Sequence, residues 1–187
     1  MSYMKGRQKQ TRPSLAAQKQ GISMITLDPI VQHNAMIFKE VRLRALQDSP
    51  SAFGSTYAKE SPLTDADWIE RAAKWNGEKS AGYLAMDKEM PCGIVAGFLD
   101  QEDVTRAHLI SMWVAPTHRR LGVGRLLVDA IISWARTKRC GTVQLMVTCN
   151  NDVAIRFYQD LGFAMTGRTE PYPNDPALIE YEMSRPT

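Results

Sequence analysis

The chain reads VAPTHRRLGVGRLL from Val114 to Leu127, and this stretch joins a predicted strand to a predicted helix. Gly122 and Gly124 remove side chains where the first backbone N–H groups of a helix have no partner. Exposed amides at a helix N-terminus bind anions, and the adjacent Arg119 and Arg120 add positive charge. The stretch therefore predicts a site for a phosphate or pyrophosphate group.

The same residues have a plainer explanation, in which the glycines only permit a tight turn and the arginines are solvated. The ligand class is also open, because the Walker A pattern of a nucleotide-binding loop is absent. A dinucleotide-binding fingerprint needs a third glycine, whereas position 127 is leucine. The stretch by itself leaves a phosphate site and a bare turn as alternatives.

The chain has 187 residues, of which 44% are hydrophobic and 23% are charged, as in an ordinary globular protein. Its net charge of +3 comes from residues 1–21, which hold five basic residues and no acidic one. We predict a disordered basic arm there and one domain over residues 22–187. That domain has a slight excess of acidic residues, so we expect no nucleic-acid partner.

Composition argues against several other classes of protein. No apolar run approaches the roughly 18 residues that cross a bilayer, so we expect no membrane partner. The three cysteines lack Cys-x-x-Cys spacing and the three histidines form no pair at helical spacing, so we expect no metal. An odd number of cysteines is typical of a reducing compartment, and we predict a cytoplasmic protein.

Hydrophobic periodicity and turn residues divide the chain into strands and helices. The predicted strands cover residues 22–27, 82–86, 93–99, 108–114, 142–147, 163–166 and 178–183. The predicted helices cover residues 28–46, 64–75, 122–138 and 151–161, and residues 48–63 and 167–177 are predicted loops. The order β-α-α-β-β-β-α-β-α-β-β predicts a single-domain α/β fold with a mixed, mostly antiparallel sheet flanked by helices.

A second motif lies downstream and reads NDVAIRFYQDLGF from Asn151 to Phe163. The stretch Val114–Leu127 resembles motif A of the GNAT superfamily of N-acetyltransferases, whose pattern is Arg/Gln-x-x-Gly-x-Gly/Ala. The second motif resembles motif B of that superfamily, Asn-x-x-Ala-x-x-Phe/Leu-Tyr-x-x-x-Gly-Phe. Two motifs in this order, separated by one strand, are more specific than either alone. The resemblance implies transfer of an acetyl group from acetyl-CoA to an amine.

The resemblance also implies roles for individual residues. Strands 108–114 and 142–147 would separate to admit the pantetheine arm of acetyl-CoA. The resemblance implies that acetyl-CoA is bound by Met112, Val114, Arg119, Arg120, Leu121, Gly122, Val123, Gly124, Arg125, Asn151 and Tyr158. The backbone N–H of Val114 would stabilise the charge that develops on the thioester oxygen, and Tyr158 would protonate the departing thiolate.

Many members of the family have a glutamate on the strand before motif A, and this chain has His108 there. Histidine side chains in general titrate near neutral pH, so His108 is our candidate general base. A strand-end histidine without a catalytic role, and deprotonation through water, remain alternatives.

We expect the acceptor to be the primary amine of a small molecule. The alternatives are a protein lysine or N-terminal amine as acceptor, and a non-catalytic acyl-CoA-binding module. A protein acceptor needs an open groove instead of a closed pocket, and the loops 48–63 and 167–177 decide between the two. A homodimer is left open.

Overall fold

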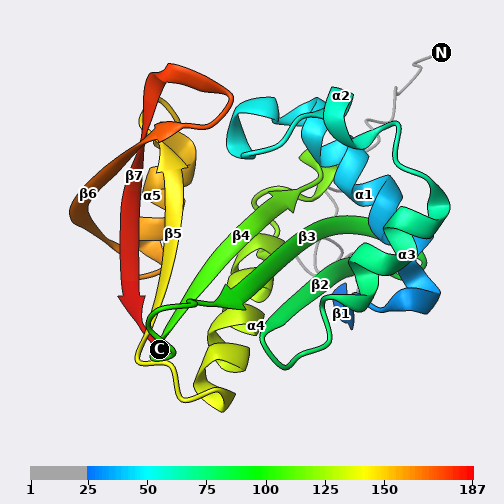
Figure 1. Ribbon diagram of the computed structural model, residues 1–187, viewed down its shortest axis with the longest axis horizontal. Coiled ribbons are helices and arrows are strands. Elements are labelled where there is room, and N and C mark those ends of the chain that lie inside the picture. Colours follow the sequence, from blue (N-terminus) through cyan, green and yellow to red (C-terminus); the bar gives the residue numbers. More distant parts are fainter. Residues whose placement is uncertain (1–24) are drawn as a thin grey trace, which may run out of the picture.

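The computed structural model describes residues 25–187 of the chain (Figure 1). The predicted basic arm and the first three positions of the predicted strand 22–27 lie outside the described residues. The strands are β1 (Ile25–Pro29), β2 (Ser80–Asp87), β3 (Met90–Leu99), β4 (Arg106–Val114), β5 (Thr142–Thr148), β6 (Ala164–Tyr172) and β7 (Asp175–Pro186). The α-helices are α1 (Ala35–Asp48), α2 (Tyr57–Glu60), α3 (Asp65–Ala73), α4 (Val123–Thr137) and α5 (Asp152–Asp160). The 3₁₀ helices are η2 (Gln32–Asn34), η3 (Pro50–Ala52) and η4 (Pro116–His118).

The strands form one sheet in the order β1-β2-β3-β4-β5-β7-β6. Neighbouring strands are antiparallel except for β4 and β5, which run parallel. The turn between β2 and β3 holds only Lys88 and Glu89, which is too short for a crossover, whereas α4 connects β4 to β5 and lets them run parallel. The predicted fold class, a mixed and mostly antiparallel sheet with helices, is confirmed.

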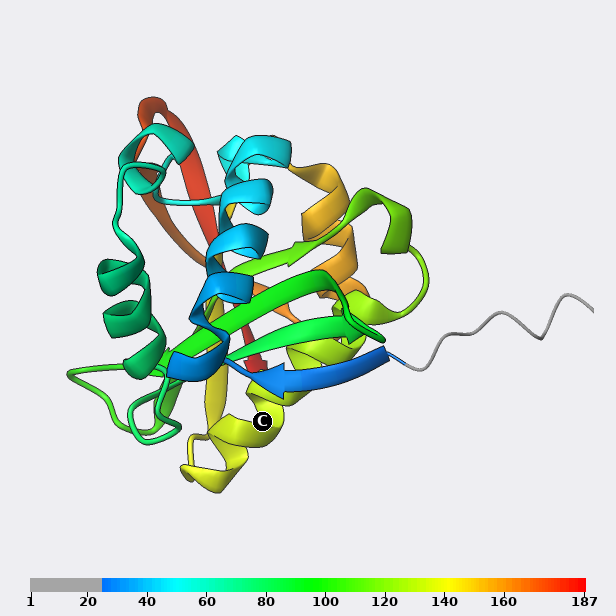
Figure 2. The ribbon, with the colours of Figure 1, turned by 90° about the vertical axis from the view of Figure 1, so that its right-hand side faces the viewer.

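Helices cover both faces of this sheet, and Figure 2 shows α1 and α4 on opposite sides of it. Glycine allows α4 to approach closely, because a Cβ at Gly93 would lie 2.9 Å from the side chain of Leu127. On the other face, a Cβ at Gly82 would lie 2.9 Å from Ile30 and 3.2 Å from Trp75. The sheet is therefore the middle layer of three, and its long central strands are buried on both sides.

The first predicted helix was placed too early. Asp28 and Pro29 belong to β1, where they pair with Leu84 and Tyr83, and the helix begins at Ala35 after a 3₁₀ turn. A proline is tolerated there because β1 is an edge strand, where a missing N–H interrupts no ladder on the open side. Pro29 does mark a change of secondary structure, but it is the last residue of a strand and does not begin a helix.

The two predicted loops also hold regular structure. Residues 48–63 contain η3 and α2, and most of residues 167–177 belongs to β6 and β7. Gly167 and Pro171 lie in this segment, and both residue types are typical of turns. The structure accommodates them through irregular pairing of β6 with β7, whose register shifts between Met165 and Thr169 and again between Pro171 and Tyr172.

Candidate active site

β4 and β5 are paired only at their first residues and then diverge (Figure 1). The last paired residues are His108 and Gln144. Directly after β4, the N–H of Ala115 donates to the carbonyl of Cys92 on β3 at 2.8 Å. Because the direction of hydrogen bonding alternates along an antiparallel strand, the preceding Val114 directs its N–H away from β3, toward the gap beside β5. The predicted separation of the two strands is confirmed, and it leaves a free backbone edge at Val114.

A bulge in β4 lies on this free edge. β4 has one more residue than β3 between Ile110 and Trp113, and Ser111 takes a left-handed backbone with φ of 56°. The guanidinium of Arg42 on α1 donates to the Ser111 hydroxyl at 3.2 Å and also pairs with the buried carboxylate of Glu60 at 2.8 Å. A buried ion pair therefore holds the bulge in place.

The loop between η4 and α4 presents backbone amides to solvent. Arg120 and Gly122 have left-handed φ values of 64° and 85°, and alternation of this kind turns successive N–H groups toward one side. Leu126 is the first residue of α4 whose N–H makes a helical hydrogen bond, which it donates to the carbonyl of Gly122 at 3.2 Å. The amides of residues 123–125 are left without a helical partner, as an anion site requires.

The arginines of this loop have different environments. The Nε of Arg119 donates to the carbonyl of Val114 at 3.0 Å, and its guanidinium is paired with the carboxylate of Asp48 at the end of α1. Its side chain therefore fixes the loop to β4 and α1. Among residues 25–187, Arg120 and Arg125 form no ion pair, so their charges remain available to an anion in front of the helix.

Glycine is needed at positions 122 and 124 for different reasons. A Cβ at Gly122 would meet nothing within 4 Å, so glycine is needed there for its left-handed backbone. A Cβ at Gly124 would lie 3.0 Å from the ends of both Met112 and Phe157. Gly124 therefore lets α4 pack against β4 and α5, which is a packing role that the sequence pattern alone does not reveal.

Helix α5 carries the two predicted site residues of the second motif. Asn151 is its N-cap, and the side-chain Oδ1 accepts from the N–H of Ala154 at 3.1 Å, which leaves the amide Nδ2 free to donate. Tyr158 is 8% exposed, and burial raises the pKa of its hydroxyl well above the ordinary value. The hydroxyl makes no hydrogen bond to any residue of the described part of the chain. The helix ends at Asp160, one residue before its predicted end, and Gly162 follows with a left-handed φ of 87°.

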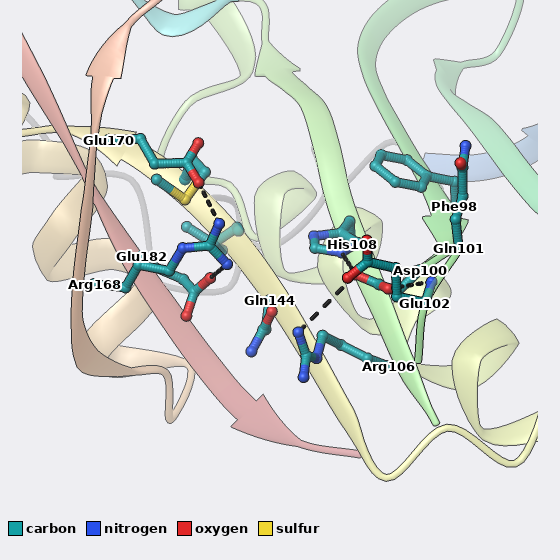
Figure 3. Close-up of a pocket in the computed structure, with 12 residues that line it drawn as sticks. Phe98, Asp100, Gln101, Glu102, Arg106, His108, Gln144, Arg168, Glu170 and Glu182 are labelled. Atoms are coloured by element: carbon teal, nitrogen blue, oxygen red, sulfur yellow. Dashed lines mark hydrogen bonds and ion pairs between the residues drawn. The ribbon is translucent and has the colours of Figure 1, made fainter. Parts of the chain in front are cut away.

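His108 has a carboxylate partner at the base of the gap (Figure 3). Its Nε2 lies 2.7 Å from Oδ2 of Asp100, and its ring stacks on Phe98 with the ring centroids 4.9 Å apart. Asp100 is itself held by the backbone N–H groups of Glu102 and Asp103, each at 2.9 Å. The hydrogen bonds from His108 and from these two amides hold the pKa of Asp100 far below its usual range. The turn therefore orients the imidazole of His108 through an ionised carboxylate.

A cavity of about 400 Å³ opens beside His108, between β4 on one side and β5, β6 and β7 on the other (Figure 3). Arg168 lies in its wall and pairs with Glu170 at 2.5 Å and with Glu182 at 3.6 Å. The side-chain Oε1 of Gln144 is buried at this wall and has no hydrogen-bond partner within residues 25–187. The volume is typical of pockets for small ligands.

The sequence profile of the acetyltransferase (GNAT) family matches residues 43–163, which include the divergent strands, the amide-lined loop and α5. This is more than half of the chain. The chain belongs to the GNAT acetyltransferase family. Its class is therefore that of an acyltransferase, as the two motifs implied.

Individual GNAT relatives differ in what they acetylate. The chain is 30% identical over 107 residues to the ribosomal protein bS18-alanine N-acetyltransferase of Salmonella typhimurium, covering 57% of this chain and 71% of that protein. It spans only 38% of the length of another curated relative, over a match of 69 residues.

Solved GNAT structures share the fold. A nourseothricin acetyltransferase superposes with a TM-score of 0.54 and 29% identity, over 58% of this chain and 66% of that one. PaiA N-acetyltransferase from Thermoplasma acidophilum, solved in complex with coenzyme A, superposes with a TM-score of 0.70 and 12% identity, over 88% of this chain and 99% of that one. At that identity the second likeness shows the fold alone.

Sequence reasoning missed several residues of this GNAT site. Asp100 lies between the predicted strands 93–99 and 108–114, where an acid eight residues before a strand histidine is a signal in the sequence. Glu180 and Glu182 alternate with apolar residues in the predicted strand 178–183, a pattern typical of a solvent face, whereas Glu182 is buried. Asp48 gave no local signal, because it meets Trp113 and Arg119 only through the fold.

Residues 25–187 lack two kinds of feature. No helix there is long and apolar enough to cross a membrane. No group of three or more His, Cys, Asp or Glu side chains in the same range is placed to hold a metal ion.

Proposed function

We propose that this protein transfers the acetyl group of acetyl-CoA to the primary amine of a small molecule, and that it does so in the cytoplasm. The observation that carries the proposal is the end of β4–β5 pairing at His108 and Gln144. Beyond that point a free strand edge connects the amide-lined N-terminus of α4 with the cavity beside His108. Donor and acceptor can thus approach the same gap from opposite ends.

The residues around the gap fit the donor. Acetyl-CoA supplies an activated acetyl thioester when it is bound. The unpaired amides of residues 123–125, with Leu121, Gly122 and the free cations of Arg120 and Arg125, suit its pyrophosphate. Arg119 contributes by holding the loop. The free edge of β4 from Met112 to Val114 offers backbone hydrogen bonds to the pantetheine arm, and Nδ2 of Asn151 offers another.

The proposed reaction uses one base and one acid. The amine nitrogen forms a bond to the acetyl carbon, the carbon–sulfur bond breaks, and the sulfur leaves with the bonding electrons. His108, oriented by Asp100, receives the proton that the amine loses. Tyr158 gives its proton to the sulfur, and because burial raises the pKa of its hydroxyl, that hydroxyl is protonated at neutral pH. The N–H of Val114 stabilises charge on the acetyl oxygen.

Contacts between residues 48–63 and residues 167–177 favour a small acceptor. The hydroxyl of Tyr172 donates to the carbonyl of Phe53 at 2.8 Å, and Nδ2 of Asn174 donates to the same carbonyl at 2.8 Å. The β6–β7 hairpin is thereby tied to the segment around η3 (Figure 1). These contacts hold the two segments together, which suits a bounded pocket better than an open groove for a polypeptide. The likeness to a nourseothricin acetyltransferase supports the same conclusion.

A protein acceptor is the second candidate. The match to the ribosomal protein bS18-alanine N-acetyltransferase covers 71% of that enzyme and favours an N-terminal amine. A coenzyme-release assay against a panel of small amines, aminoglycosides and peptides with free N-termini or lysines separates the two. We expect turnover to be highest with small amines. Turnover confined to peptides would replace the proposal, and failure to bind acetyl-CoA would remove it.

A further inference from the structure

Three polar side chains form a row across β5, β7 and β6 on the acceptor side of the sheet. Thr148 on β5 is directly opposite Glu180 on β7, and Glu180 is directly opposite Glu170 on β6. Residues directly opposite one another in neighbouring strands point to the same face, with Cβ atoms about 5 Å apart. Glu170 lines the cavity, so the row starts at the cavity wall and continues through Glu180 to Thr148.

The members of this row are incompletely paired within the described part of the chain. Arg168 already binds Glu170 and Glu182. Glu180 is partly buried and has no ion pair or side-chain hydrogen bond. Thr148 is only 2% exposed, and its buried Oγ1 lacks any partner. Such atoms are rare in native proteins, because a buried polar atom without a hydrogen bond costs free energy.

Two carboxylates directly opposite each other repel, and burial makes that repulsion costly. Burial, with the charge of Glu170 as a second cause, raises the pKa of Glu180 above its ordinary value. A positive group placed between these side chains would relieve both the repulsion and the missing hydrogen bonds. An ammonium group has three donors, which match the two carboxylates and the Thr148 hydroxyl.

We propose that the acceptor carries a second amino group, which binds as an ammonium ion to Glu180, Glu170 and Thr148 while its first amino group is acetylated. The inference rests on the proposed function and names the class of its substrate, a small diamine or polyamine. Glu180 is the specificity residue, because it has no ion-pair partner within the described residues, whereas Glu170 is paired with Arg168.

The spacing along the sheet limits the length of the acceptor. Gln144, which pairs with His108, lies four residues before Thr148 on β5, and four residues of strand span about 13 Å. If the reacting amine is bound beside its proposed base His108, the second nitrogen at Thr148 is at most about 13 Å away. Flexible diamines with four to eight carbons are the matching probes.

The test compares each diamine with the monoamine of equal chain length, in the wild-type enzyme and in Glu180→Gln. We expect the wild type to prefer the diamine by at least about tenfold in kcat/KM, since a partly buried charge pair commonly contributes 1.4 kcal/mol or more. In Glu180→Gln the diamine should lose most of that advantage while turnover of the monoamine stays the same. Glu78→Gln, which removes the same charge at an exposed position, is the control and should keep the full preference.

Other outcomes overturn the proposal in distinguishable ways. Equal kcat/KM for diamines and monoamines in the wild type shows that no second ammonium is bound. An equal loss for both substrates in Glu180→Gln assigns the residue to folding or to the chemistry. If no amine is turned over and acetyl-CoA does not bind, the proposed function itself has failed, which is a different result from turnover without charge preference.

Discussion

The indole Nε1 of Trp113 on β4 donates a hydrogen bond of 2.8 Å to the carboxylate of Asp48 at the end of α1. The same carboxylate pairs with the guanidinium of Arg119 in the amide-lined loop. Burial alone would raise the pKa of Asp48, but hydrogen bonds from Trp113, Ser49 and Arg119 outweigh it and lower the pKa. One acid therefore connects α1, the strand that bears the free edge and the loop proposed to hold pyrophosphate.

Replacing Asp48 by Asn should weaken this connection without changing the size of the side chain. We expect the KM for acetyl-CoA to rise about tenfold and the free energy of unfolding to fall by about 1–3 kcal/mol, since hydrogen bonds to a charged group are lost. Steady-state kinetics and urea unfolding measure the two effects. Asp160→Asn, at an exposed position on α5, is the control. An unchanged KM would show that the loop holds its conformation without Asp48.

Tyr158→Phe should separate chemistry from binding. The hydroxyl has no hydrogen-bond partner within residues 25–187, so its removal leaves the packing of the ring intact. We expect kcat to fall by about 100-fold or more, as is usual when a general acid is lost, with the affinity for acetyl-CoA nearly unchanged. Calorimetry with coenzyme A and a coenzyme-release assay test this. Tyr57→Phe on the exposed side of α2 should behave as wild type, and a Tyr158 variant that does the same would exclude the acid role.

His108 and Asp100 should act as one unit. We expect His108→Gln to lower kcat/KM by about 100-fold, and Asp100→Asn to lower it by about tenfold through loss of orientation. The double variant should be no slower than His108→Gln alone, because an orienting partner has no effect once the base is absent. Full additivity of the two losses would mean that Asp100 acts independently of His108.

Glu60 should make stability depend on acid pH. Burial by itself would raise its pKa, but the hydrogen bond and charge of Arg42, with Arg71, more than offset burial and lower the pKa below its ordinary 4.5. A lowered carboxyl pKa stabilises the fold fully above 4.5, and that contribution is lost as pH falls through the folded value. We expect Glu60→Gln to cost about 3–5 kcal/mol at pH 7, since it leaves Arg42 buried without its partner.

Unfolding of the Glu60→Gln variant and of the wild type, measured from pH 7 to pH 3, tests this pH dependence of stability. The difference between them should shrink below about pH 4, where the wild type loses the same ion pair. Glu89→Gln in the exposed β2–β3 turn is the control. A difference that stays constant to pH 3 would indicate that packing, and not charge, explains the cost.

Glu180→Gln should stabilise the protein at pH 7, whereas Glu60→Gln should destabilise it. The pKa of Glu180 is raised, so its ionised form costs stability at neutral pH, and stability is regained as pH falls below the raised value. We expect the variant to raise Tm at pH 7 by about 1–3 °C, because it removes a partly buried charge and the repulsion of that charge by Glu170. The gain should vanish near pH 4. Scanning calorimetry at the two pH values measures it, and a lower Tm at pH 7 would show that Glu180 is already paired in the folded protein.

The sequence was sufficient for the features that depend on local order along the chain. The alternation of Ile179, Tyr181 and Met183 predicts a strand, and the stripe that begins at Val123 predicts a helix, because the period of burial is set by backbone geometry. The glycine pattern after Arg120 predicts an exposed helix N-terminus, which the backbone confirms at Gly122. The family followed from two such local patterns in order.

Only the tertiary structure decided which distant side chains meet. Asp48 and Trp113 are 65 positions apart, and Arg42 reaches Ser111 across 69, so no periodicity could pair them. The row of Thr148, Glu180 and Glu170 exists because β7 lies between β5 and β6 in the sheet, although β7 follows β6 in the sequence. Local geometry thus determined the elements and the donor motif. The acceptor side depends on sheet order and on long-range hydrogen bonds, which a linear pattern does not encode.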